Sequence, residues 1–438
     1  MSNPLRTVFD FKRQEIPVAI SLFFFFFLVI AVFQILKPLK KGLFVNSYGD
    51  YGAEMELYAK LANIGMALLA MIFFTYLYNR MPRQQIIYVL CVFFIAWFVW
   101  FAFALVDPGW FSIWSFYLIG DVETTLFVAA FWAYATDLSN SDQAKRLFGV
   151  IGGGGVIGGW VGISFASTLL ESIGMRGLLI MTTAMMVLIG VLTFGIERWI
   201  RQTGVFHGPT HLREVRKRAS QEKSKFREAI EGARLVAASK YLAAIVGIMA
   251  FYEIASQVID YQFSTLLEPF ETDVGTQSYI AKVYFYANTL AVLVQFFLVS
   301  LIMRKLGLTT ALLVLPVAIL ATSPVFLAVP TLTVVSFFVF FENGLNYSIQ
   351  QTSRESLFVP TSPDEKYKAR AFTDMFVQRA AKGVGIGAVI ALGLLGFSAR
   401  QFTWITITVV ILMALCGIYA GRRFASTIRD KGDKLKAA

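Results

Sequence analysis

Cysteine and histidine are nearly missing from this sequence of 438 residues, which has two of each. Cys91 and Cys416 both lie in apolar runs, so the chain offers neither a disulfide framework nor a CxxC metal motif. His207 and His211 lie in a polar middle segment, and with thiols so scarce they do not indicate a zinc site. We therefore predict no metal and no cofactor.

Charged residues are also scarce: they make up 15% of the chain, whereas a soluble domain has about 25%. Hydrophobic residues reach 57%, and phenylalanine alone occurs 42 times. The first apolar run, Ile16–Leu36, has no signal-peptide cleavage pattern and is long enough to span a bilayer. The composition predicts a polytopic α-helical membrane protein. The lack of a nucleophile–base or metal constellation argues against an enzyme.

Positive charge is in excess, with a formal net charge of +11. Basic residues gather at the ends of apolar runs and in one central segment, which the positive-inside rule explains without bound nucleic acid. This distribution predicts an inner-membrane protein with both termini on the cytoplasmic side. We expect it to be monomeric and to bind no nucleic acid.

Apolar runs of membrane length fall into two sets of six. The sets occupy residues 1–196 and 241–438, and the basic segment 197–240 between them has too few apolar residues to form a core. The second run of each set leads into a short basic loop, YNRMPRQQIIYVL (78–90) and LIMRKLGLTTALL (301–313). These paired loops resemble those of the major facilitator superfamily. The predicted fold is all-α, with twelve transmembrane helices in two six-helix halves.

A glycine-rich stretch, FGVIGGGGVIGGWVG (148–162), lies in the predicted fifth span. It lacks the GK[ST] ending and the preceding strand of a phosphate-binding loop, so we do not expect a nucleotide-hydrolysing site there. Small residues instead let transmembrane backbones approach one another, and this pattern predicts close helix packing.

Ionisable residues inside the apolar spans are costly and should face a bundle interior or a watery cavity. The stretch ILKPLKKGLFV (35–45) holds three lysines, of which Lys40 lies one turn beyond Lys37. Either these lysines snorkel at a helix end, or at least one has a function. Asp121 and Glu123 lie two residues apart in the fourth span, so they point in different directions. Both are candidates for counter-charge or proton coupling.

A second group of charges lies toward the cytoplasmic ends of the tenth and eleventh spans. Arg379 and Lys382 are three residues apart and share one helix face. Either the cations anchor the spans at the membrane edge, or they converge on an anion, which suits the planar fork of arginine. We favour the anion site. The predicted substrate contacts in this half are Asn346, Arg354, Glu355, Arg379 and Lys382.

Two aspartates of the second half, Asp260 and Asp374, are further candidates for counter-charge or coupling. Asp260 and Glu253 lie in the seventh span, and Lys282 lies in the eighth. A structural ion pair between these two spans and a role in substrate binding are both open interpretations.

Three stretches resemble a known family when they are taken in chain order. They are ILKPLKKGLFV with Gly52-Ala53-Glu54 after it, FWAYATDLSNSDQAKRLFGVIGGG (131–154) and YSIQQTSRESLFVPTSPDEKYKARAFTD (347–374). Each is similar to a motif of the ATP/ADP transporters of plastids and intracellular bacteria. The resemblance implies a nucleotide carrier, with Lys40 and Arg354 at positions of functional lysines in that family.

We therefore predict a secondary transporter that moves a nucleotide such as ATP or ADP, or a related phosphorylated metabolite, by alternating access. One alternative is a proton-coupled carrier or exporter of another organic anion or a drug-like compound. Another is a membrane partner or sensor that does not transport, with the segment 197–240 as its docking surface.

Overall fold

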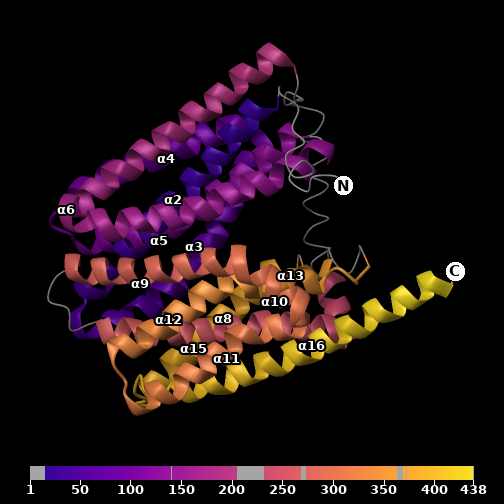
Figure 1. The fold of residues 1–438 in the computed structure, drawn as a ribbon. Coiled ribbons are helices and arrows are strands. Elements are labelled where there is room, and N and C mark those ends of the chain that lie inside the picture. The colour runs from indigo at the N-terminus through magenta and orange to yellow at the C-terminus, as the bar shows by residue number, and fades with distance from the viewer. Residues whose placement is uncertain are drawn as a thin grey trace. The chain divides into compact units, whose positions relative to one another are not determined.

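The computed structural model describes residues 15–139, 141–204, 231–267, 273–362, 368–370 and 372–437. Over these ranges the chain forms helices and no strand (Figure 1). Nine helical segments in them are long and apolar enough to cross a membrane. The structure thus confirms a multi-pass all-α membrane protein, whereas the count of twelve spans stays a prediction.

The first part of the chain folds into long helices because its apolar runs have few breakers. The last of them, α6, turns at Gly174, whose φ of 67° is a left-handed value that glycine adopts readily. The predicted fifth and sixth spans are therefore the two arms of α6. The helices are α2 (Ile16–Ser47), α3 (Gly52–Arg80), α4 (Arg83–Ala104), α5 (Trp110–Leu138) and α6 (Ser141–Thr203).

The second part contains π-helical segments within its helices. π-Helical turns occur often at functional sites because they change which side chains face a given direction. The three segments are η2 (Val294–Leu298), η3 (Asn346–Gln350) and η4 (Thr373–Val377). The α-helices are α8 (Lys240–Leu267), α9 (Asp273–Leu293), α10 (Val299–Lys305), α11 (Gly307–Ala328), α12 (Leu332–Leu345), α13 (Gln351–Leu357), α15 (Gln378–Leu394) and α16 (Thr403–Ala437).

Contacts divide the chain into two compact units. Unit 1 comprises residues 1–47, 62–219 and 270–285, and unit 2 comprises residues 48–61, 220–269 and 286–438. Two helices are shared, because α3 begins in unit 2 and continues in unit 1, whereas α9 begins in unit 1 and continues in unit 2. The domain boundaries expected from the sequence stay a prediction.

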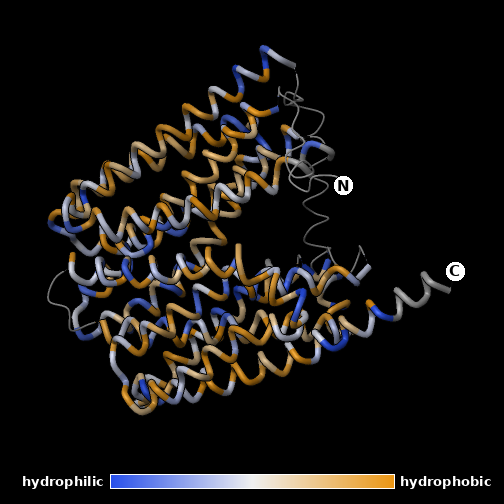
Figure 2. Tube along the Cα trace, in the orientation of Figure 1, coloured by the Kyte–Doolittle hydropathy of each residue, from blue (hydrophilic) through white to orange (hydrophobic). Residues whose placement is uncertain are grey.

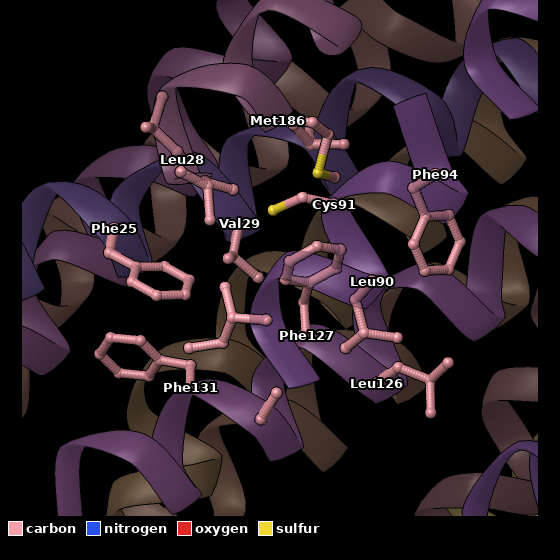
Figure 3. Close-up of a cluster of buried hydrophobic side chains, with 14 of the residues drawn as sticks. Phe25, Leu28, Val29, Leu90, Cys91, Phe94, Leu126, Phe127, Phe131 and Met186 are labelled. Carbon is pink, nitrogen blue, oxygen red and sulfur yellow. The ribbon is translucent and has the colours of Figure 1, made fainter. Parts of the chain in front are cut away.

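Aromatic side chains fill the core of unit 1. Figure 3 shows Phe25 of α2 beside Phe131 of α5, and their ring centroids lie 5.0 Å apart in an edge-to-face arrangement. Phe94 of α4 and Phe127 of α5 are fully buried in the same cluster. Edge-to-face pairs of this kind contribute beyond the area that they bury.

The glycine-rich stretch lies in α6 against α2, as predicted. A Cβ atom on Gly154, Gly158 or Gly162 would collide with the backbone carbonyl oxygens of Phe23, Phe27 and Ala31 respectively. The spacing of four residues keeps these glycines on one side of α6. Close backbone packing of α2 and α6 therefore depends on the missing side chains.

Candidate substrate-binding sites in the two units

Hydrophilic residues interrupt the apolar helices of both units (Figure 2). In unit 1 the Lys40 ammonium of α2 forms an ion pair with Oδ1 of Asp121 on α5. The other oxygen of the same carboxylate accepts a hydrogen bond from the Asn63 side-chain amide of α3. Lys40 is only 6% exposed, and its ammonium lies 5.0 Å from the ring centroid of Tyr117. An aromatic face adds to the attraction for the cation.

The lysines of this region lie well inside α2. We expected the first span to end at Leu36, but the helix continues to Ser47 through Pro38. Lys41 is 4% exposed, and the Lys37 ammonium lies 3.9 Å from the ring centroid of Tyr284. Snorkelling at a helix end therefore does not describe them, because the helix continues beyond them and their charges lie against protein groups.

The two acidic residues of α5 have different surroundings, as their spacing predicted. The Asp121 side chain is 33% exposed and meets Lys40, whereas Glu123 is 0% exposed. Glu123 accepts a hydrogen bond from the neighbouring Thr124 hydroxyl at 3.0 Å through Oε2. Its Oε1 has no hydrogen-bond partner in the part of the chain that the structure describes.

In unit 2 the partner of Asp260 is Lys60 of α3, a residue that the sequence analysis overlooked. Glu56, one turn earlier, lies 3.5 Å from the Lys60 ammonium and accepts a hydrogen bond from the Ser264 hydroxyl of α8. The available signal was a lysine inside an apolar run, four residues after a glutamate. The lysines considered as candidates in this part of the sequence were those of the preceding helix, α2.

For Lys282 in the eighth span we considered an ion pair with an acid of the seventh span. Lys282 of α9 instead lies 2.9 Å from Oε1 of Glu171 on α6, within unit 1. Ser278 donates to the same carboxylate oxygen at 2.7 Å. Lys282 meets α6 because the first part of α9 belongs to unit 1. The order of the spans along the chain does not reveal this.

Glu253 of α8 connects that helix to α15. It accepts a hydrogen bond from the Gln378 amide at 2.8 Å, and its other oxygen lies 3.8 Å from the Lys382 ammonium. Lys382 is therefore close to a carboxylate but loosely paired, because the distance is near the limit for an ion pair. Arg379, three residues earlier, is partly exposed and has no ion pair within the described ranges.

The predicted substrate contacts on η3 and α13 differ in their exposure and in their polar partners. Arg354 is partly exposed and makes no ion pair with any residue described. Glu355 forms a two-point ion pair with Arg370, with a distance of 3.1 Å between Nη1 and Oε2. Asn346 is 8% exposed, and its Oδ1 is without a partner among the described residues. The Asp374 side chain lies outside what the structure describes.

The structure thus places Lys40, Asp121 and Glu123 in unit 1, and places the other described candidates in unit 2. Each unit holds cations inside long apolar helices beside carboxylates, and unit 2 also holds two arginines that form no ion pair with the residues that the structure describes. These features define a helical membrane transporter for charged solutes.

Solved transporters have the same fold. A D-xylose-proton symporter aligns with a TM-score of 0.59 at 13% identity, over 91% of this chain and 97% of its own. The POT family transporter PepTSo aligns with a TM-score of 0.59 at 12% identity, over 96% of this chain and 98% of its own. The nucleoside transporter NupG aligns with 0.58 at 14%, over 93% and 99%. These similarities confirm the predicted major facilitator-type fold.

The TLC ATP/ADP transporter family profile matches residues 2–108 and 108–340, and the chain belongs to this family. ADP,ATP carrier protein 1 of Rickettsia conorii is 21% identical over 88% of this chain and 87% of its own. ADP,ATP carrier protein 5 of Rickettsia bellii is 23% identical over 89% and 90%. ADP,ATP carrier protein 1 of Chlamydia pneumoniae is 21% identical over 93% and 90%. The resemblance seen in the sequence and the predicted secondary transport function are confirmed.

Proposed function

We propose that this transporter moves ATP, ADP or a closely related phosphorylated nucleotide across the cytoplasmic membrane by alternating access. Its relatives in Rickettsia conorii and Chlamydia pneumoniae are ADP,ATP carrier proteins, which supports this substrate class. The proposal places both termini on the cytoplasmic side, as the basic residues favour. The transporter acts as a monomer and binds no nucleic acid.

The observation that carries the proposal is the ion pair of Lys40 and Asp121 inside membrane helices. A charged residue at such a depth is costly, and it is typically kept because it contacts a substrate or an ion. With no cargo bound, Asp121 neutralises Lys40. A phosphate group carries more negative charge than one carboxylate, so it competes with Asp121 for the lysine.

Unit 2 supplies the second set of cations. Arg354 and Arg379 have no ion pair within the described ranges, and Lys382 is loosely paired with Glu253. A guanidinium presents its donors in a planar fork that matches two phosphate oxygens. In the proposed cycle these three cations hold phosphate groups, while Asp260 balances Lys60 when no cargo is bound.

Exchange and proton symport make different use of the carboxylates of unit 1. Exchange needs only that Asp121 and the cargo replace each other on Lys40. Symport needs a group that takes up and releases a proton, and Glu123 is the candidate, because it is buried without a cation in any salt bridge that the structure describes.

The proposal is tested by uptake into proteoliposomes of the purified protein. Labelled ATP and ADP are offered with and without a pH gradient, and with unlabelled nucleotides, inorganic phosphate or a non-nucleotide organic anion as competitors. We expect ATP uptake that internal ADP accelerates, and competition by other nucleotides. Uptake of an organic anion without any uptake of, or competition by, nucleotides would refute the substrate class.

A further inference from the structure

One side of the helix formed by α12, η3 and α13 is polar and exposed. Its members recur every three or four residues, and each is partly or fully exposed. We name this set the α12–α13 stripe, and it consists of Asn343, Tyr347, Gln351 and Arg354. Ser348 and Gln350, on the opposite side, are 0% and 1% exposed. The helix therefore turns one definite side away from the interior of unit 2.

The stripe is suited to water rather than lipid. An arginine and two amides on a lipid-facing side would be expensive, so these side chains point to a wet path. Just before the stripe, the carboxylate of Glu342 accepts hydrogen bonds from Tyr252, and from Ser256 at 2.9 Å, both on α8. Glu342 is 5% exposed, so these bonds fix the buried side of α12 against α8, the helix that also carries Glu253 and Asp260, and leave the stripe on the other side.

Tyr347 is the aromatic residue of this stripe and is 54% exposed. Neither Tyr347 nor Gln351 makes a hydrogen bond to any residue that the structure describes. A large exposed ring among amides and an arginine needs an explanation, because about half of the residue's surface is left uncovered by the residues that the structure describes. Aromatic side chains that present a face to a wet path are common platforms for nucleobases.

We propose that Tyr347 stacks on the nucleobase of the cargo, that Gln351 bonds to an edge of that base, and that Arg354 holds its phosphates. This inference rests on the proposed function, since it names the part of the same site that recognises the base. Tyr347 and Arg354 are seven residues apart, or roughly 10 Å along the helix axis, a separation suited to the two ends of one nucleotide. A carboxamide can donate and accept at once, as the edge of an adenine requires.

The test separates base from phosphate by using three competitors of labelled ATP uptake: ATP, adenosine and inorganic tripolyphosphate. Tripolyphosphate carries the charge without the base, and adenosine carries the base without the charge. We expect Tyr347→Ala to raise the KM for ATP about tenfold or more and to abolish competition by adenosine, with tripolyphosphate competing as before. Tyr347→Phe keeps the ring, so its KM stays within about twofold of the wild type.

Two further variants complete the comparison. Arg354→Ala should weaken competition by ATP and tripolyphosphate together, because both use the phosphate contact. Tyr419→Ala removes a tyrosine of α16 that is also exposed, at 44%, and should leave all three competitors unchanged. An unchanged KM for ATP in Tyr347→Ala, or an equal loss for ATP and tripolyphosphate, would overturn the inference. A wild-type protein that takes up no nucleotide would instead refute the proposed function.

Discussion

Lys40 has two competing partners in the proposed cycle, the carboxylate of Asp121 and a phosphate of the cargo. A buried ion pair contributes little net stability, because desolvation of both charges offsets their attraction. Removing one partner is costly, since the other charge is then left without its counter-charge. Stability and transport should therefore respond differently to substitutions at these two positions.

Lys40→Ala should lower both the melting temperature in detergent and ATP uptake, because Asp121 loses its cation and the cargo loses a contact. The double variant Lys40→Ala/Asp121→Ala should recover most of the melting temperature, because no unpaired charge remains, while uptake stays at least about tenfold down. Thermal unfolding and labelled uptake measure the two effects on the same preparations. Recovery of uptake together with stability would assign the pair a purely structural role.

At the scale of single residues, the sequence singled out charges within apolar runs but could not predict which of them meet. Lys40 and Asp121 were both identified, and their different helices gave no way to pair them. Lys60 was overlooked although Glu56 lies one turn before it on α3, and its other partner, Asp260, lies on α8, which spacing along α3 does not reveal. Pairing is a property of helix packing, which spacing along one helix does not contain.

The helix pair α2 and α6 makes a prediction at the scale of elements. Gly158→Ala should lower the melting temperature and the yield of folded protein, because its Cβ collides with the Phe27 carbonyl oxygen and forces the backbones apart. Gly152→Ala is the matched control, since a Cβ there meets no atom within 4 Å. The control should be neutral or slightly stabilising, because alanine favours helix over glycine.

An equal effect of the two alanine variants would mean that α2 and α6 tolerate a wider separation. The larger variant Gly158→Leu then provides a second check, because a leucine at a true backbone contact cannot be absorbed by small shifts. Fluorescence-detected gel filtration and thermal unfolding are sufficient measurements.

At this scale hydropathy predicted the ends of some helices closely and the ends of others poorly. Hydropathy of the sequence alone places two of the spans in the second set at Tyr241–Leu266 and Leu308–Ala328, and α8 and α11 agree with them to within one residue at each end. The predicted first span, Ile16–Leu36, ends eleven residues before the helix does. The three lysines after Leu36 indicate a helix end in the sequence, but α2 continues through them to Ser47. The π-helical segments were not foreseen, since their hydrogen-bond pattern depends on packing and not on a sequence period.

For the whole molecule, the fold class followed from composition and the family from motifs in chain order. The sequence did not predict that α3 and α9 are each divided between the two units, because hydropathy assigns each helix to one half. This division also decides which charged side chains meet. The beginning of α3 brings Lys60 and Glu56 to α8, and the beginning of α9 brings Lys282 to α6.

These two polar contacts should differ in strength, which gives a last prediction. Lys60→Met keeps an apolar stem but removes the cation beside Glu56, whose side chain is 2% exposed, and Asp260, which is 27% exposed. We expect a destabilisation of about 1–3 kcal/mol, below the full value for a buried pair because Asp260 is partly solvated. Adding Asp260→Asn should recover part of it by removing one of the two negative charges that Lys60 balances.

Lys282→Met is the control for that experiment, because its ion pair with Glu171 is exposed on both sides, at 53% and 61%. Water already solvates these charges, so the pair contributes little to stability and its loss should change the melting temperature hardly at all. If Lys282→Met costs as much as Lys60→Met, burial does not decide the strength of these contacts. If only Lys60→Met is costly, the buried charges beside Lys60 hold the beginning of α3 in unit 2.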